Sequence, residues 1–362
     1  MENRSLELIQ DKRYVRELFE RCVLDARCSG CAACVLSCPV KALDYDHEKP
    51  VLLENCIDCE LCFKACPRLN LNTEHITELA FGYSNPPSFN EAFGNYLSVL
   101  AVHSAKPAIR ERGQDGGLVS GLILWMMEKG LAKGAVVAQR TVAWDGKPTI
   151  ATTPEEVLAG AGSVYTYVPN SLALLDAKKL EDLVFVGTGC QVTGVRQLQA
   201  AKSKALRNAV KPVGLTIGLF CTKAYTYEGL MRQKVQGELG ISADEIAKMN
   251  IKKGNVHVTL RSGEDVAIPL KEVNDYTREG CLKCPDFSAE YADISVGGLG
   301  QEGWSFIILR TELGQSIFDK AAREGVFTVR PMEEFPDAMT LLVKSAKKQR
   351  ARGRAGAVAV EA

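Results

Sequence analysis

The chain has 362 residues and carries 44 basic and 44 acidic side chains, so its formal net charge is zero. This balance provides no basic field for nucleic acid. Its most apolar stretch, residues 118–127, is too short to span a bilayer, and residues 1–16 are too charged for a secretory signal peptide. We therefore expect a cytoplasmic protein without a transmembrane segment, bound at most peripherally to the inner face of a membrane through a partner complex.

The first predicted domain is residues 1–70. Apolar residues recur near helical spacing in residues 1–25, which predicts a leading helix. Cys22 lies in this helix and fits no ligand pattern, so we interpret it as a small buried apolar side chain. Short strands are predicted at residues 42–45 and 51–53.

Residues 28–66 contain one cysteine spacing written twice, C-x2-C-x2-C-x3-C-P. In bacterial ferredoxins this spacing holds two [4Fe–4S] clusters, and the fourth cysteine of each run ligates the other cluster. The predicted first thiol set is Cys28, Cys31, Cys34 and Cys66. The predicted second thiol set is Cys38, Cys56, Cys59 and Cys62. Structural zinc usually takes separated cysteine pairs and disulfides require a secreted protein, so both fit this spacing poorly.

The remainder of the chain is predicted to form a connector, a larger domain and a tail. Residues 71–94 are expected to be an extended connector, and residues 336–362 a frayed tail, with binding to a membrane or partner as the alternative. Between them, residues 95–335 alternate strand-like and helix-like runs, which indicates an α/β or α+β domain with a mixed sheet. Strands are expected at 97–103, 134–140, 183–186, 212–220, 294–296 and 305–310, and a hairpin at 255–268. Helices are expected at 116–129 and, after the glycine-rich turn at 187–189, through residue 198.

Four further cysteines fall in the larger domain. Cys190 and Cys221 each follow a predicted strand, and Cys281-x2-Cys284 forms a loop pair. These four residues are the predicted third thiol set, because strand ends and a loop can converge at one edge of a sheet. Four thiolates suit either a structural zinc or another [4Fe–4S] cluster. The two clusters expected at the N-terminus favour a third cluster here.

Several motifs in the larger domain together resemble one family. They are Gln114-Asp115-Gly116-Gly117 before a helix, Thr188-Gly189-Cys190-Gln191, Phe220-Cys221, Cys281-x2-Cys284-Pro285-Asp286-Phe287 and the run from Ala292 to Gly298. Over roughly residues 90–335, the chain resembles the family of beta subunits of coenzyme F420-reducing hydrogenase. With its two-cluster N-terminal module, it looks most like the input subunit of F(420)H(2) dehydrogenase, a protein type associated with methanogenesis in archaea.

The resemblance implies a flavoprotein that binds FAD and exchanges a hydride with the deazaflavin coenzyme F420. It also implies a [4Fe–4S] cluster at the third thiol set. Family members commonly have proline directly before the Cys-Gln pair, where this chain has Gly189. A glycine there removes no ligand but loosens the turn.

The candidate FAD-binding residues follow from this resemblance and from small residues before helices, where backbone N–H groups bind phosphate. Gly116-Gly117 and Thr188-Gly189 each precede a predicted helix. As a bare pattern, two glycines before a helix are more often an ordinary turn, and the family resemblance reverses that preference. The full candidate set is Gln114, Asp115, Gly116, Gly117, Ser120, Tyr165, Thr166, Tyr167, Asn170, Thr188, Gly189, Gln191 and Asp293.

These features predict an F420 oxidoreductase in which reduced F420 gives a hydride to FAD and electrons leave singly through three [4Fe–4S] clusters to a partner protein or complex. No side-chain acid or base is assigned to this step. Arg110, Arg112, Lys223 and Arg278 are candidate cations for the anionic F420 tail. Two alternatives remain: a flavoprotein of the same family with another donor or acceptor, of the formate dehydrogenase or chlorin reductase type, and a flavin-free electron-transfer subunit with structural zinc.

Overall fold

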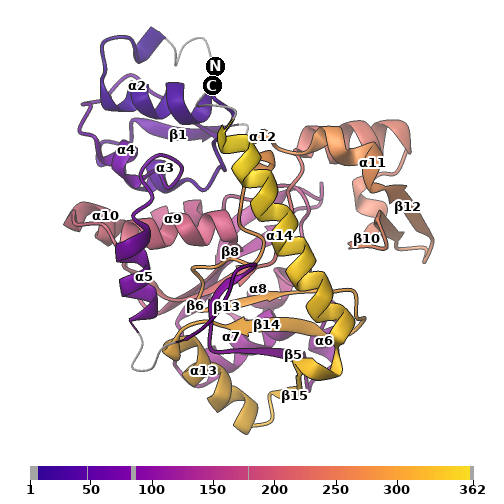
Figure 1. The fold of residues 1–362 in the computed structure, drawn as a ribbon. Helices are drawn as coiled ribbons and strands as arrows, with labels where there is room; N and C mark the ends of the chain where they lie inside the picture. The colour runs from indigo at the N-terminus through magenta and orange to yellow at the C-terminus, as the bar shows by residue number, and fades with distance from the viewer. Residues whose placement is uncertain (1–6, 47, 83–86, 178, 359–362) are drawn as a thin grey trace.

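The computed structural model describes residues 7–46, 48–82, 87–177 and 179–358 (Figure 1). A mixed sheet of eight strands forms its centre, in the order β15-β5-β14-β13-β9-β8-β6-β7. Its strands are β5 (Ser98–Ser104), β6 (Gly134–Arg140), β7 (Gly146–Ala151), β8 (Leu183–Thr188), β9 (Val213–Leu219), β13 (Ile294–Gly297), β14 (Ser305–Leu309) and β15 (Phe327–Pro331). The predicted mixed-sheet fold class is confirmed.

The four central strands β13, β9, β8 and β6 are parallel, and the outer strands pair antiparallel to their neighbours. The carboxyl ends of parallel strands meet at one edge of a sheet, which is where open α/β sheets bind ligands. Residues after β8 and β9, including Cys190 and Cys221, are therefore carried to this carboxyl edge.

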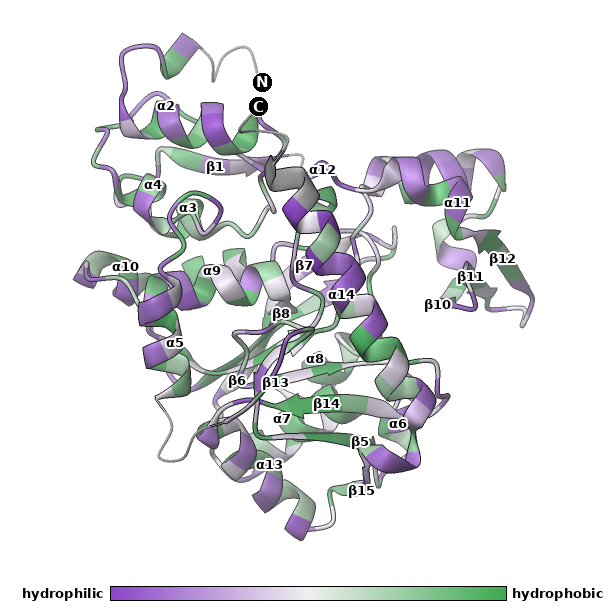
Figure 2. Cartoon of the chain, in the orientation of Figure 1, coloured by the Kyte–Doolittle hydropathy of each residue, from purple (hydrophilic) through white to green (hydrophobic). Residues whose placement is uncertain are grey.

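Both faces of the sheet are buried. On β8, Val184 and Val186 pack into one apolar core, and Leu183 and Phe185 pack into another on the opposite face, as expected from the alternation of side chains along a strand. Figure 2 shows β14 in green, whereas hydrophilic residues recur along the surrounding helices. The first face is covered by α7 (Leu118–Glu128), α8 (Pro154–Ala159) and α13 (Glu312–Arg323). The second is covered by η2 (Asn170–Leu175), α9 (Gly189–Gln199), α10 (Lys204–Ala209) and α14 (Pro336–Val358).

The cysteine-rich module lies against the second face of the sheet, next to α9 (Figure 1). Its elements are α2 (Tyr14–Leu18), the π-helical turn η1 (Phe19–Val23), α3 (Ala33–Leu36), β1 (Leu43–Asp46), β2 (Lys49–Leu52) and α4 (Leu61–Ala65). β1 and β2 pair antiparallel, which confirms the two short strands predicted there. Ala33 and Leu36 share an apolar core with Val192 and Val195 of α9, so the module is packed directly onto the sheet domain.

The connector differs from the prediction. Residues 71–94 were expected to be extended, but α5 (Thr73–Phe81) is a helix, and Asn72 caps it by accepting a 3.2 Å hydrogen bond from His75 N–H. An asparagine in this position satisfies one of the free N–H groups of the first helical turn. A two-stranded ribbon follows, formed by β3 (Ser88–Asn90) and β4 (Gly94–Tyr96). A short helix, α6 (Pro107–Arg112), lies between β5 and α7.

A separate lobe carries the predicted hairpin. The hairpin is β11 (Asn255–Leu260) with β12 (Asp265–Pro269), and β10 (Ile246–Lys252) adds a third strand that was not predicted. Tyr225, Leu230 and Met249 belong to a core of their own in this lobe. Its remaining elements are η3 (Glu228–Glu238), η4 (Ala243–Glu245), α11 (Leu270–Val273) and η5 (Asn274–Tyr276), and α12 (Glu279–Leu282) leads back to the sheet.

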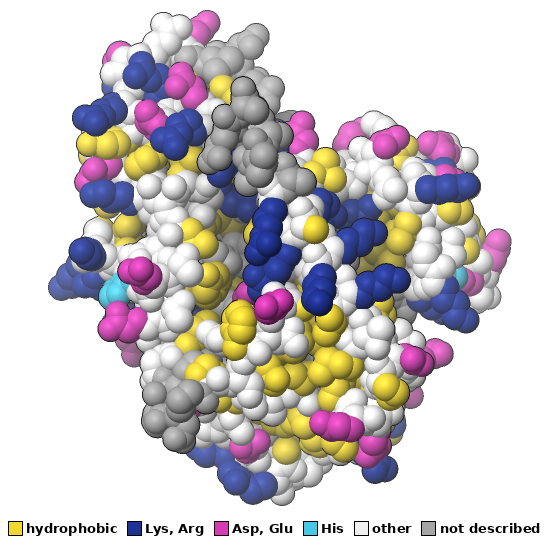
Figure 3. Space-filling model, viewed as in Figure 1, with side chains coloured by type: hydrophobic (Ala, Val, Ile, Leu, Met, Phe, Trp, Pro, Cys, Tyr) yellow, Lys and Arg dark blue, Asp and Glu magenta, His cyan; other side chains and the backbone are white. Residues whose placement is uncertain are grey.

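The C-terminal prediction of a frayed tail is wrong for the described residues. After η6 (Met332–Glu334), helix α14 continues to residue 358, because Ala338, Leu342 and Ala346 pack against Phe306 and Ile308 of β14. Figure 3 shows Lys and Arg side chains gathered along the outer face of this helix. In the part of the chain that the structure describes, no helix is both long and apolar enough to cross a membrane.

Candidate functional site

Two loops of the module present cysteines in the same backbone conformation. In the first loop Gly30 and Ala32 have φ angles of 75° and 61°, and at the matching positions of the second loop Asp58 and Glu60 have φ angles of 51° and 65°. Backbone turned in this way can point N–H groups into a concavity that binds anions. Each loop is followed at once by a short helix, α3 or α4. The repeated conformation therefore fits two anionic clusters.

The thiols of these loops lie together in the two predicted sets. Burial raises the pKa of Cys34, and Cys28, Cys31 and Cys66 add to this effect. Burial also raises the pKa of Cys62 to about 12, with Cys56, Cys38 and Cys59 contributing. All four thiols of the second set line one small cavity. Such thiols bind a metal as thiolates and release protons when they do so, and the donor sets fit the sulfur ligands of [4Fe–4S] clusters.

The third thiol set lies at the carboxyl edge of the sheet. Cys190 stands in the first turn of α9, Cys221 lies two residues after the end of β9, and Cys281 lies in α12. Burial raises the pKa of Cys221, and Cys281, Cys190 and Cys284 raise it further. The Cys221 N–H donates to the Phe287 carbonyl at 2.8 Å, which fastens the strand end to the loop after Cys284. The four donors therefore come together from three separate segments.

Among the described residues, no three or more His, Cys, Asp or Glu side chains are grouped to hold a single metal ion. A cubane cluster takes one ligand at each of four irons, so its donors stand farther apart than the ligands of one ion.

Gly189 lies where the structure leaves no room for a side chain. A Cβ atom at this position would overlap a carboxylate oxygen of Asp286 and lie 3.2 Å from the Cα atom of Ala289. The loop that carries Cys284 therefore packs directly onto the start of α9. Next to it, Thr188 Oγ1 lies 3.3 Å from Cys190 Sγ.

The loop with Gln114 and Asp115 also reaches the carboxyl edge. Gln114 accepts a 3.1 Å hydrogen bond from Ser163 N–H. A Cβ atom at Gly298 would lie 2.6 Å from Asp115 Oδ2, so this carboxylate packs against the loop after β13. Burial raises the pKa of Asp115 to about 6, although Lys248 of β10 opposes the shift.

Gly116, Gly117 and Ser120 begin α7, but part of their role is packing. A Cβ atom at Gly116 would lie 2.5 Å from the Val102 carbonyl oxygen, and the Gly116 N–H already donates to Ser305 Oγ at 3.0 Å. Gly117 has a φ of 74°, a conformation that favours glycine. Ser120 is buried in the first turn of the helix. The Gly116 N–H is therefore not free for a phosphate.

Residues 166–171 show the feature that best fits a bound polar cofactor. Four of their buried side-chain atoms have no hydrogen-bond partner within the described structure: Thr166 Oγ1, Tyr167 Oη, Asn170 Oδ1 and Ser171 Oγ. Buried polar atoms are rarely left unpaired, and a cluster of them calls for an explanation such as a missing ligand. Ser171 was not predicted, although it directly follows the polar run that was.

The other predicted residues of this region hold the segment in place. Gln191 Oε1 accepts from Asn170 N–H at 3.1 Å, and Gln191 Nε2 donates to the Val168 carbonyl at 2.8 Å. Tyr165 points instead toward the separate lobe, where its hydroxyl accepts a 3.1 Å hydrogen bond from Ile251 N–H. Thus Gln191 orients the segment from α9, and Tyr165 joins it to β10.

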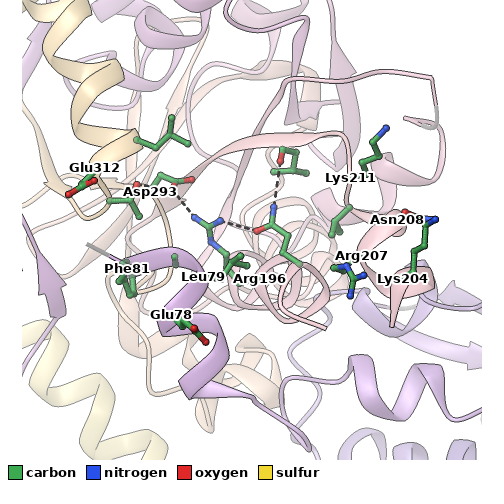
Figure 4. A pocket seen from close by; sticks show the side chains of 17 residues that line it. Glu78, Leu79, Phe81, Arg196, Lys204, Arg207, Asn208, Lys211, Asp293 and Glu312 are labelled. Atoms are coloured by element: carbon green, nitrogen blue, oxygen red, sulfur yellow. Dashed lines mark hydrogen bonds and ion pairs between the residues drawn. The ribbon is translucent and has the colours of Figure 1, made fainter. Parts of the chain in front are cut away.

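Asp293 is not brought to this region. It precedes β13, at the opposite edge of the sheet from Gly298. Its carboxylate pairs with Arg196 at 2.8 Å and accepts hydrogen bonds from Thr216 and Thr311. Figure 4 shows Arg196 pointing toward Asp293 at the side of a separate pocket. The carboxylate is engaged in a buried structural network, so the prediction that it reaches the flavin does not fit its position.

The candidate cations have different surroundings. Arg110 donates to the Ser104 carbonyl at 2.8 Å, and Arg112 is exposed. The Lys223 ammonium donates to Asn274 and lies 5.2 Å from the ring centroid of Tyr225. Arg278 is buried and paired with Glu48, and its guanidinium carbon lies 3.9 Å from the ring centroid of Tyr167. Glu48 could not have been predicted, because it lies 230 residues from Arg278 in the sequence.

Comparison with known proteins supports the combination of an N-terminal cysteine-rich module with this sheet domain. Residues 27–70 match the 4Fe-4S dicluster domain, and residues 99–175 and 180–335 match the N-terminal and C-terminal parts of the coenzyme F420 hydrogenase/dehydrogenase beta subunit. The coenzyme F420 hydrogenase subunit beta of Methanothermobacter thermautotrophicus is 35% identical over 263 residues, which cover 71% of this chain and 92% of that protein. An F(420)H(2) dehydrogenase subunit of Methanosarcina mazei is 30% identical over 230 residues, which cover 63% of this chain and 64% of that protein.

A solved structure agrees with these matches. A chain from the F420-reducing [NiFe] hydrogenase complex of Methanosarcina barkeri aligns with a TM-score of 0.70 and 30% identity, over 74% of this chain and 93% of that chain. The resemblance inferred from the motifs is confirmed, including the likeness to the F(420)H(2) dehydrogenase subunit. The chain belongs to the family of coenzyme F420 hydrogenase/dehydrogenase beta subunits, which are F420-linked oxidoreductase subunits, and it carries a 4Fe-4S dicluster domain at its N-terminal end.

Proposed function

We propose that this chain oxidises reduced coenzyme F420 at a bound FAD and delivers single electrons to a partner through [4Fe–4S] clusters at its three thiol sets. A deazaflavin exchanges electrons in pairs, as hydride, whereas a flavin also exchanges single electrons. When bound, FAD would therefore convert hydride transfer into single-electron transfer. The relatives' names support the F420 part of this proposal.

The observation that carries the proposal is that the segment with unpaired polar atoms, residues 166–171, lies near both the third thiol set and the first. After burial, the strongest influence raising the pKa of Tyr167 is Cys190, and Cys31 also contributes. A Cβ atom at Gly194 of α9 would lie 3.2 Å from Cys31 Sγ, so the helix that begins with Cys190 also packs on the first set. The second set is farther along the module, in the cavity lined by Val15 and Ile57.

The side chains near this segment serve to bind and orient. Asn170 Oδ1 and the hydroxyl of Ser171 offer polar atoms for a ring or ribose, and Gln191 orients Asn170. Asp115 offers a carboxyl group whose raised pKa lets it also donate a hydrogen bond near pH 6. Hydride transfer between two rings requires that they be held face to face and protected from water. No acid or base is needed for that step.

The direct test is to mix the purified protein with reduced F420 and an artificial one-electron dye, and to follow the visible absorbance of the deazaflavin. Appearance of oxidised F420 together with dye reduction is expected. Formate or a chlorin substrate in place of reduced F420 serves as the comparison for the other donors of the family. Turnover with one of these and none with F420 would reject the assignment.

Metal and flavin analysis tests the alternative of a flavin-free protein with structural zinc. The proposal requires about twelve irons and one flavin per chain, because three cubane clusters hold four irons each. About eight irons, one zinc and no flavin would support the alternative instead.

A further inference from the structure

Arg278 joins the cysteine-rich module to the sheet domain. Its side chain is 4% exposed. Nη1 donates to the Ser29 carbonyl at 2.8 Å, Nη2 donates to the Glu48 carbonyl at 2.7 Å, and Nε pairs with Glu48 Oε2 at 2.5 Å. Because a guanidinium stays protonated in proteins, this contact places a fixed positive charge inside the interface.

The first thiol set lies on one side of this charge. Ser29 stands between Cys28 and Cys31. A Cβ atom at Gly30 would lie 2.5 Å from Arg278 Nη2, so only a glycine leaves room for the guanidinium beside this loop. The guanidinium therefore lies beside the loop that carries Cys28 and Cys31.

The third thiol set lies on the other side. The guanidinium carbon is 3.9 Å from the ring centroid of Tyr167, whose surroundings include Cys190. The Arg278 carbonyl accepts a 3.0 Å hydrogen bond from Cys281 N–H, which begins the turn that carries two ligands of this set. None of these contacts involves the residues that line the cavity of the second set.

Reduction of a cluster adds one negative charge. A buried positive charge stabilises the reduced form of any cluster close to it, and the effect weakens with distance and with exposure to water. We propose that Arg278 is a positioning residue whose charge raises the reduction potentials of the clusters at both the first and the third thiol sets. The reduction potential of the cluster at the second set is not changed by it. Glu48 acts in the opposite direction and limits the shift.

This inference rests on the clusters of the proposed function but not on its chemistry with F420. Potentials are measured by EPR-monitored redox titration of the full-length holoprotein with dithionite, and signals are assigned with Cys59→Ser for the second set and Cys284→Ser for the third. Arg278→Gln is expected to shift the potentials of the first and third sets to more negative values. Glu48→Gln is expected to shift both to more positive values, because it removes the opposing charge.

Two further variants make the test specific. Arg278→Lys keeps the charge and should restore most of the potential lost in Arg278→Gln. Lys49→Gln removes a half-buried cation that pairs with Glu279 and should have a smaller effect, because water screens it. If Arg278→Gln loses iron, the test rests on the cluster potentials of Arg278→Lys and Glu48→Gln.

Equal shifts at all three sets, a shift at only one of the two inner sets, or shifts of the same sign in Arg278→Gln and Glu48→Gln would overturn the proposal. Failure of reduced F420 to react would count against the proposed function alone, since the titration with dithionite does not depend on it.

Discussion

Cys22 Sγ lies 3.7 Å from Cys66 Sγ, in the interior of the cysteine-rich module. Hydrogen bonds with Cys28 and Cys66 raise the pKa of Cys22, as does its burial. A thiol that remains protonated beside two ligand sulfurs can donate a weak hydrogen bond to one of them. Such hydrogen bonds raise the potential of a cluster.

Cys22→Ala should therefore lower the reduction potential of the cluster at the first thiol set without loss of iron. Cys22→Ser retains a donor and should leave the potential closer to that of the wild type. Redox titration and iron analysis check both variants. Loss of one of the cluster irons in Cys22→Ala would show instead that Cys22 is a ligand.

Cys59→Ser tests the direction of electron flow through the module. Cys59 belongs to the second thiol set, which lies away from the sheet domain. We expect reduction of bound flavin by reduced F420 to continue and transfer to an artificial one-electron acceptor to fall at least tenfold. Rapid-mixing spectroscopy separates the two steps, and loss of flavin reduction itself would contradict this order.

Gly189→Ala should destabilise the start of α9. The added methyl group would overlap the Asp286 carboxylate, and forced overpacking of this kind costs about 1–3 kcal/mol. Gly214→Ala is a suitable control, because the nearest atom to its Cβ position lies at an ordinary 3.4 Å. Denaturant titration should show a lower midpoint only for Gly189→Ala.

Asp293→Asn should reduce stability strongly while leaving the flavin content of the folded protein unchanged. The Arg196 side chain, 9% exposed, would lose its charge partner, and breaking a buried ion pair costs about 3–5 kcal/mol. Glu181→Gln removes an exposed pair with Lys211 and should change little. Loss of flavin from folded Asp293→Asn would restore the role in binding that its position argues against.

Asp115→Asn should remove part of the pH dependence of stability. Because burial raises the pKa of Asp115 to about 6, the folded state holds this proton more tightly than the unfolded state does. Stability is then expected to fall as the pH rises from about 4 to 6 and to stay lower above that, by roughly 2–3 kcal/mol. Denaturant titrations at pH 5 and pH 7 should differ less in the variant than in the wild type.

The sequence predicts the parts of this protein that depend on local pattern. β6 has the predicted bounds, residues 134–140, because a continuous apolar run marks a strand buried on both faces. The cysteine spacing alone predicts the N-terminal module. This module matches the 4Fe-4S dicluster domain, and the match does not depend on the motifs in the sheet domain. Strands at the margins, such as β7 and β15, were missed because their residues are largely polar and only partly buried.

What the sequence could not predict depends on contacts between distant segments. α14 looks like a basic tail until Ala338, Leu342 and Ala346 are seen against the sheet. Asp293 lies in a family motif, but only the fold shows that it stands at the far end of β13 from Gly298. The pairing of Glu48 with Arg278 likewise has no local signal.

The two cysteine loops have matching backbone conformations but are anchored to different parts of the protein. At the same position of the repeat, Gly30 leaves space for Arg278, whereas the carboxylate of Asp58 accepts hydrogen bonds from the N–H groups of Arg13, Tyr14 and Val15 at the start of α2. One loop is therefore fastened to the neighbouring domain and the other to the leading helix of its own module. The two loops share a backbone conformation but are not interchangeable, because each is shaped for a different neighbour.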